Sequence, residues 1–197
     1  QPTASISGTT TICSGNSATI SFTGTPNAIV TYTVNGGVNQ TITLDTVGNA
    51  SLTTGNISSS EVYNLLQAST QTIPSCSQTL SGTATITVLA LPTASISGSS
   101  TICYNTSTTI NFVGTPNAIV TYTVNGGSNQ AIVLDSTGNA TLNTGNLAST
   151  STYSLVSVSS ATTPVCTQLI SDSAVITVIP QPTASISGTT TICSGNS

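Results

Sequence analysis

The residues of this chain that could take part in chemistry are few. In 197 residues there are five cysteines and four acidic residues, and there is no Lys, Arg, His or Met. Without His or Lys, and with the acids scattered along the chain, general acid–base and nucleophilic mechanisms lack their usual groups. A metal site is disfavoured too, because neither a CxxC pair nor a His is present. We therefore expect no enzyme activity, no metal and no cofactor.

The absence of cations excludes further classes of function. With no Lys or Arg, nothing can neutralise phosphates, so we expect no nucleic-acid partner. Attraction to anionic membrane surfaces fails for the same reason. No apolar run approaches the roughly 18 residues that cross a membrane, and no signal peptide or initiator Met is present, which predicts a segment of a mature protein without direct membrane insertion.

The sequence repeats itself with a period of 90 residues. "PTASISG" begins at Pro2, Pro92 and Pro182, and "GTPNAIVTYTVNGG" begins at Gly24 and again at Gly114. A period of 90 exceeds the roughly 20–50 residues of a solenoid unit and suits an independent small domain. The predicted organisation is one repeat over residues 1–90, a second over 91–180, and the truncated start of a third over 181–197.

Each repeat consists of short alternating runs separated by turn residues. In "TATITV" the apolar residues share one face and the threonines the other, as in a half-buried strand. "NGG" at Asn35–Gly37 and "VGN" at Val47–Asn49 are hairpin turns. The predicted strands of the first repeat are Thr3–Ser7 with Thr10–Cys13 as one strand, then Ser17–Thr23, Ala28–Asn35, Asn39–Leu44, Asn49–Thr54, Glu61–Ala68 and Leu80–Leu89.

Seven strands in about 90 residues predict an all-β fold of tandem immunoglobulin-like sandwiches. Only about three residues separate the last strand of one repeat from the first strand of the next. Pro92 and Pro182 lie in these linkers, where they fix φ and favour extended geometry. We therefore expect the repeats to follow one another head to tail as a stiff rod.

The cysteines fall into two classes. Cys13, Cys103 and Cys193 lie before the second strand of each repeat, and Cys76 and Cys166 lie between the last two strands. A fixed two-cysteine pattern in small hydroxyl-rich domains favours disulfides in an oxidising, extracellular setting.

Strand direction bears on which cysteines pair. Five strands separate Cys13 from Cys76, and an odd number of antiparallel strands places the two residues at opposite ends of a sandwich. A disulfide requires Cα atoms within about 7 Å. In a head-to-tail rod this favours Cys13 with Cys166, between neighbouring repeats. A miscount by one strand would instead restore Cys13–Cys76 and Cys103–Cys166 within repeats. In the favoured scheme Cys76, Cys103 and Cys193 have partners outside the segment.

The phrases "PTASISGTTTIC", "GTPNAIVTYTVNGG", "STYSLVSVSS" and "TPVCTQ" resemble repeats of giant surface adhesins of gliding Bacteroidota, of the SprB type. The resemblance implies export by the type IX secretion system and a cell-surface filament. It also implies that other parts of the protein bind an external surface or polysaccharide. The function that we expect is a structural stalk module whose partners are neighbouring repeats. The alternatives are a glycan- or surface-binding module and a subunit of a self-assembling fibre or sheath.

Three acidic residues begin a short motif. "DTV", "DST" and "DSA" resemble the D-(S/T)-small or apolar acceptor of O-glycosylation in Bacteroidota. The resemblance implies covalent glycans on Thr46, Ser136 and Ser173. The alternative is that Asp-Ser and Asp-Thr simply suit turns, since their side chains hydrogen-bond nearby backbone.

Overall fold

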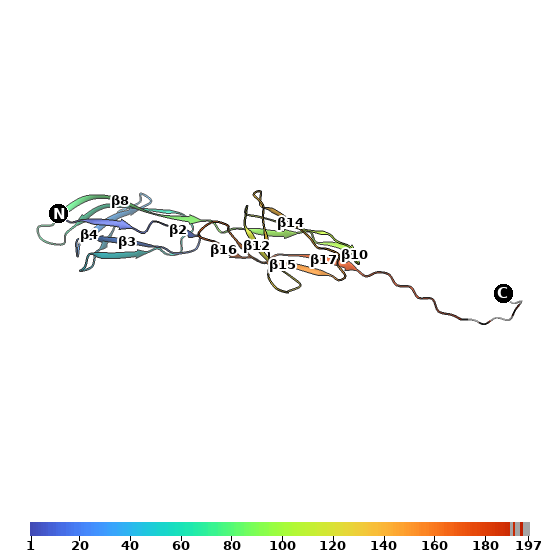
Figure 1. Ribbon diagram of the computed structural model, residues 1–197. Helices are drawn as coiled ribbons and strands as arrows, with labels where there is room; N and C mark the ends of the chain where they lie inside the picture. The colour runs from blue at the N-terminus through green and yellow to red at the C-terminus, as the bar shows by residue number, and fades with distance from the viewer. Residues whose placement is uncertain (190, 192–193, 195–197) are drawn as a thin grey trace. The chain divides into compact units, whose positions relative to one another are not determined.

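The computed structural model describes residues 1–189, 191 and 194, which form strands β1 to β17 and contain no helix (Figure 1). The chain divides into two compact units. The first unit comprises Gln1–Thr93 together with Val158–Gln168, and the second comprises Ala94–Ser157 with Leu169–Ser197. A short segment of the second sequence repeat thus groups with the first repeat. The described residues from 181 onward, where a third repeat was expected to begin, contain no strand.

The first unit is a sandwich of two sheets. Its smaller sheet has the order β1-β3-β6 and its larger sheet the order β2-β8-β7-β4-β5. The predicted strand segments are all present, with ends that differ by up to three residues, although the first predicted strand is divided in two. The smaller sheet contains β1 (Ala4–Ser7), β3 (Thr19–Gly24) and β6 (Asn49–Thr53), and the larger contains β2 (Thr10–Cys13), β4 (Ile29–Val34), β5 (Gln40–Thr43), β7 (Glu61–Ser69) and β8 (Ser77–Leu89).

The first predicted strand is divided between the two sheets. β1 pairs antiparallel with β3, whereas β2 crosses to the other sheet and pairs in parallel with β8. Gly8 lies at the crossing with φ of 115°, a conformation that residues with side chains rarely adopt. A Cβ on Gly8 would also lie 2.5 Å from the carbonyl oxygen of Thr19. The sequence prediction of a single first strand was therefore wrong, because this glycine redirects the chain.

The second sequence repeat forms the same two sheets. Gly98, with φ of 114°, takes the place of Gly8 between its first two strands. Its sheets have the orders β14-β11-β9 and β10-β17-β15-β12-β13, with β16 paired to β15. The strands are β9 (Ala94–Ser97), β10 (Ser100–Cys103), β11 (Thr109–Gly114), β12 (Ile119–Val124), β13 (Gln130–Val133), β14 (Asn139–Asn143), β15 (Ser151–Ser159), β16 (Thr167–Leu169) and β17 (Ser173–Ile179).

The core of the first unit lies between its two sheets. Ile20 and Phe22 of β3 are fully buried against residues of the other sheet, including Val30 and Ile86. In β8 the alternation is as predicted, with Ala84 and Ile86 buried. Aromatic rings extend the packing, since the centroid of the Phe22 ring is 5.1 Å from that of Tyr32, whose own centroid is 6.3 Å from that of Tyr63. Burial of alternate apolar side chains therefore holds the two sheets together.

The last strand differs between the two repeats. β8 is continuous through Gly82, where an added Cβ would lie 3.2 Å from the Ile6 side chain. The equivalent position of the second repeat is Asp172, in the break between β16 and β17. Its carboxylate accepts hydrogen bonds from the N–H groups of Ile96, at 3.2 Å, and Ser173, at 2.9 Å. The Leu155 N–H still donates to the backbone carbonyl oxygen of Asp172 at 2.8 Å, so the carboxylate adds hydrogen bonds to backbone pairing at this point.

Candidate functional site: the cysteines

Cys13 and Cys166 form a disulfide. Their Cα atoms are 5.5 Å apart across a sequence separation of 153 residues, a distance typical of a disulfide. Both belong to the first compact unit, because Cys166 lies in the segment that groups with it. Both residues are buried, with 8% of Cys13 and 1% of Cys166 exposed. The pairing is the one between sequence repeats that the strand count favoured.

Backbone hydrogen bonds fix the position of Cys13 at the end of β2. The parallel pairing places Cys13 opposite Leu89, the last residue of β8. Immediately after it, the Ser14 N–H donates to the carbonyl oxygen of Leu89, and the Gly15 N–H donates to that of Ile57, both at 2.8 Å. The sulfur thus lies where β2 and β8 end together.

A self-contained loop between β15 and β16 presents Cys166. The Ser160 N–H donates to the carbonyl oxygen of Cys166 at 2.8 Å, and the Cys166 N–H donates to the Ser160 hydroxyl at 2.9 Å. The loop contains a cis peptide bond between Thr163 and Pro164. These reciprocal hydrogen bonds close the loop.

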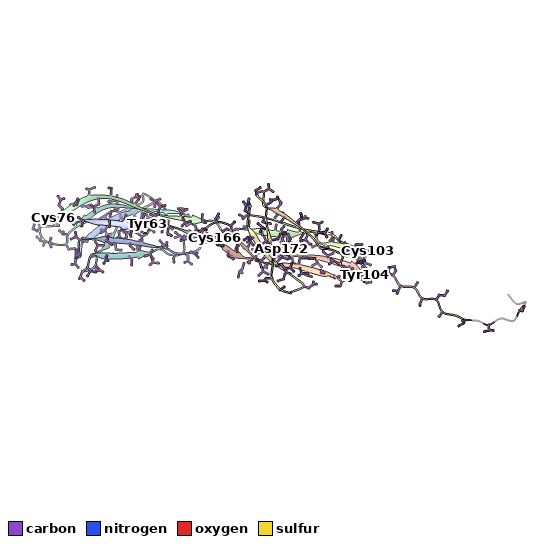
Figure 2. All side chains as sticks on the ribbon, in the orientation of Figure 1. Tyr63, Cys76, Cys103, Tyr104, Cys166 and Asp172 are labelled. Carbon is purple, nitrogen blue, oxygen red and sulfur yellow. A yellow bond between two sulfur atoms is a disulfide. The ribbon has the colours of Figure 1, made fainter. Side chains whose placement is uncertain are left out.

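The length of β8 explains why the within-repeat pairing does not form. Cys13 is level with the last residue of β8, while Cys76 immediately precedes the first. Thirteen residues of strand span about 40 Å at about 3.3 Å per residue, far beyond the reach of a disulfide. Figure 2 shows Cys76 and Cys166 at opposite ends of the first unit. Cys13 and Cys166 are bonded to each other, so neither of the alternative pairs, Cys13–Cys76 and Cys103–Cys166, forms.

Two further cysteines are free and exposed. They are Cys76, in the loop before β8, and Cys103, at the end of β10. The prediction that their partners lie outside the segment stays a prediction. Cys193, predicted to behave likewise, lies outside the described residues.

The predicted glycan acceptors are all exposed in this structure. Thr46 and Ser136 occupy equivalent turns that are held by the preceding carboxylate. Asp45 Oδ1 accepts hydrogen bonds from the N–H groups of Val47 and Asn49, at 2.9 and 2.8 Å. Ser173 begins β17. The Asp45 turn has the geometry of the alternative explanation, in which Asp-Thr serves the backbone, so glycosylation of Thr46, Ser136 and Ser173 stays a prediction.

Sequence reasoning missed two features beside the cysteines. One is the cis proline in each cysteine loop, at Ile73–Pro74 and Thr163–Pro164; its signal was a proline two residues before each cysteine. The other is Tyr104, which follows Cys103 and is 45% exposed, where the first repeat has Ser14. In the part of the chain that the structure describes, no three His, Cys, Asp or Glu residues gather as metal ligands.

Comparison with solved structures identifies the fold. A marsupial T cell receptor is 13% identical and superimposes with a TM-score of 0.61, covering 92% of this chain and 74% of the receptor chain. The fold is immunoglobulin-like. A three-domain fragment of titin gives a TM-score of 0.54 at 19% identity, covering 91% of this chain and 66% of the titin chain, so this chain spans about two thirds of that fragment.

The other comparisons return no relatives. No protein-family model matches the chain, and no curated protein matches it. The immunoglobulin-like fold and the disulfide together are typical of extracellular or secreted domains that serve as structural or binding modules. Among the described residues, no helix is long and apolar enough to cross a membrane.

The few ionisable side chains predict an unusual dependence of stability on pH. Hydrogen bonds from the Asn139 N–H, then from the hydroxyl and N–H of Thr137, lower the pKa of Asp135 below its usual 3.8. Burial raises the pKa of four tyrosines above 10.0, and at Tyr63 the nearby Glu61 carboxylate raises it further. These tyrosines are Tyr32, Tyr63, Tyr122 and Tyr153.

The signs follow from linkage between ionisation and folding. Asp135 makes its full contribution to folding stability above its unfolded pKa of 3.8. That contribution is lost as the pH falls through the lower pKa that Asp135 has in the folded chain. The four tyrosines make their full contribution to folding stability below pH 10.0, their unfolded pKa. That contribution is lost as the pH rises toward the higher pKa values that they have in the folded chain. With no His, we expect the Tm of the chain, its free thiols alkylated, to vary by less than about 2 °C between pH 5 and 8. The Tm, measured by circular dichroism, should fall below pH 4 and above pH 10. A steep change of Tm between pH 5 and 8 would contradict the conclusion that Asp135 and the buried tyrosines set the pH dependence of stability.

Proposed function

We propose that this chain is a load-bearing stalk segment of a long extracellular filament, built to carry a surface adhesin away from the cell. The observation that carries the proposal is the Cys13–Cys166 disulfide, which joins sequence repeats rather than closing within one. The resemblance of the repeats to adhesins of gliding Bacteroidota supports the adhesive and motile role and export by the type IX secretion system. External surfaces or polysaccharides are then partners of other parts of the protein.

The disulfide determines how tension passes along the chain. A pull on the two ends enters through residues 1–13, crosses the sulfur–sulfur bond to Cys166 and leaves through the residues after it. Residues 14–165 lie off this covalent path. Most of the strands in both repeats, and the apolar cores that they form, are therefore shielded from end-to-end load. This arrangement suits a stalk, because loss of packing in a shielded region would not lengthen the filament.

The composition supports a position outside the cell. Disulfides persist in oxidising environments. The chain also offers no cleavage site to trypsin-like proteases, because it contains neither Lys nor Arg. The disulfide closes a loop in the unfolded chain and lowers its conformational entropy. In the chain-entropy model this stabilises the folded chain by about 4–5 kcal/mol. These properties favour long survival in an extracellular setting.

Single-molecule pulling tests the mechanical part of the proposal. With handles on the two termini, the oxidised chain should release less length on unfolding than the reduced chain. The difference is set by the 153-residue separation and amounts to about 500–550 Å at about 3.5 Å per residue. The double variant Cys76→Ser/Cys103→Ser keeps the disulfide and should match the oxidised chain, whereas Cys13→Ser should match the reduced one. Equal released lengths in oxidised and reduced chains would contradict the load path.

Immunogold electron microscopy tests the filament part of the proposal. Antibodies raised against this chain should label thin threads that extend away from producing cells, at regular intervals set by the repeats. Cells lacking the gene provide the control for background labelling. Label confined to the envelope, or recovered only from the medium, would overturn the stalk assignment without affecting the measured load path.

A further inference from the structure

The two free cysteines occupy the same structural positions as the two bonded ones. Cys103 lies 90 residues after Cys13, and Cys76 lies 90 residues before Cys166. Each free cysteine therefore has a bonded counterpart in the other repeat of the same molecule.

The backbone around Cys103 reproduces the backbone around Cys13. Cys103 lies opposite Ile179, the last residue of β17, as Cys13 lies opposite Leu89. The Tyr104 N–H donates to the carbonyl oxygen of Ile179 at 3.0 Å, and the Asn105 N–H donates to that of Leu147 at 2.8 Å. These are the counterparts of the bonds made by the two residues after Cys13. The end of the second repeat is thus already shaped as the end that accepts Cys166 in the first.

The loop around Cys76 likewise reproduces the loop around Cys166. The Thr70 N–H donates to the carbonyl oxygen of Cys76 at 2.8 Å, and the Cys76 N–H donates to the Thr70 hydroxyl at 2.9 Å. The Ile73–Pro74 peptide bond is cis, as in the other loop. Since Cys76 is free, these hydrogen bonds form in the absence of a disulfide.

Exposure distinguishes the free positions from the bonded ones. Cys13 and Cys166 are buried, whereas Cys76 and Cys103 are exposed. Around Cys103 lies an open hollow of about 410 Å³, lined by Tyr104, Asn105, Ile179 and Pro180 among others. Ile179 is 54% exposed and Tyr104 is 45% exposed, and Figure 2 shows Tyr104 beside Cys103 at one end of the second unit. This end therefore has an accessible thiol and uncovered apolar surface.

We propose that Cys103 is a connection site for the Cys76 loop of a second copy of this chain, joined by a disulfide equivalent to Cys13–Cys166. The proposal rests on the stalk function above and deepens it, because it specifies how one repeat is joined covalently to a neighbouring copy. The occupant is specified by the internal repeat, because the loop bonded to Cys13 has the same reciprocal hydrogen bonds as the Cys76 loop. The sites are therefore complementary to each other and not to themselves.

The cross-link requires an external disulfide as oxidant, such as glutathione disulfide. The Cys103 thiolate attacks it, forming a mixed disulfide and releasing one glutathione thiol. The Cys76 thiolate of the second copy then attacks the Cys103 sulfur and releases the second glutathione. Two protein thiols are oxidised, one glutathione disulfide is reduced to two thiols, and both thiol protons pass to solvent or to the released glutathione.

Single-cysteine variants test whether the pairing is specific. In a Cys193→Ser background, one protein carries Cys76→Ser and the other Cys103→Ser, and both retain the Cys13–Cys166 disulfide. Each is incubated with glutathione disulfide alone and in an equimolar mixture, then analysed by non-reducing electrophoresis and mass spectrometry. We expect the mixture to give Cys103–Cys76 dimers at least about tenfold in excess over dimers formed by either variant alone, an energetic preference of about 1.4 kcal/mol.

Other outcomes would overturn the proposal. Homodimers formed as readily as the mixed dimer would show nonspecific oxidation of exposed thiols. Glutathionylated monomers without dimers would show that the thiols react but the surfaces do not dock. Either result would leave the load path through Cys13–Cys166 intact, since that path is measured separately by pulling on the single chain.

Discussion

The direction and length of the last strand of the repeat constrain much of this structure. β8 runs from the residue after Cys76 to Leu89, level with Cys13. A rigid strand of about 40 Å separates two side chains that require Cα atoms within about 7 Å to bond. The two cysteines of one repeat are thus held apart by the same hydrogen-bonded sheet that positions each of them. The disulfide forms instead with the equivalent residue of the other repeat.

This constraint gives the cysteines a role that differs from core stabilisation. A disulfide within one sandwich would reinforce a single domain and leave the linker to carry any load. The observed disulfide spans 153 residues and places most of both repeats outside the covalent path between the chain ends. In the stalk function that we propose, folding of the cores positions the sulfur atoms, and the covalent path carries the tension. The proposed role is compatible with a chain of almost no charge, because it needs no ionisable group.

Much of the fold could be predicted from the sequence because the signals are local. Alternation in "TATITV" predicts burial of Ala84 and Ile86, and Asn35–Gly36 adopts positive φ at both residues, as expected for a type I′ hairpin turn. The count of strands was sufficient to favour Cys13–Cys166, since parity depends on strand number and not on exact ends.

Other features depend on tertiary contacts that a single repeat does not reveal. The crossing at Gly8 could not be read from the sequence, because positive φ and close approach to Thr19 appear only when β1 and β2 lie in different sheets. Asp172 was seen as part of a glycan motif, whereas its hydrogen bond to the Ile96 N–H requires two strands distant in sequence to meet. The grouping of Val158–Gln168 with the first repeat was not expected either. This segment contains Cys166, which is bonded to Cys13 of the first repeat.

The most direct test of the account is disulfide mapping of the native, unreduced chain. Free thiols are alkylated at acidic pH to prevent exchange, and the chain is digested with proteases that cut at aromatic and aliphatic residues, since it lacks Lys and Arg. Mass spectrometry should find the peptide containing Cys13 linked to the peptide containing Cys166, with that link lost on reduction. A Cys13–Cys76 peptide would contradict the account, because it would require the two ends of β8 to meet.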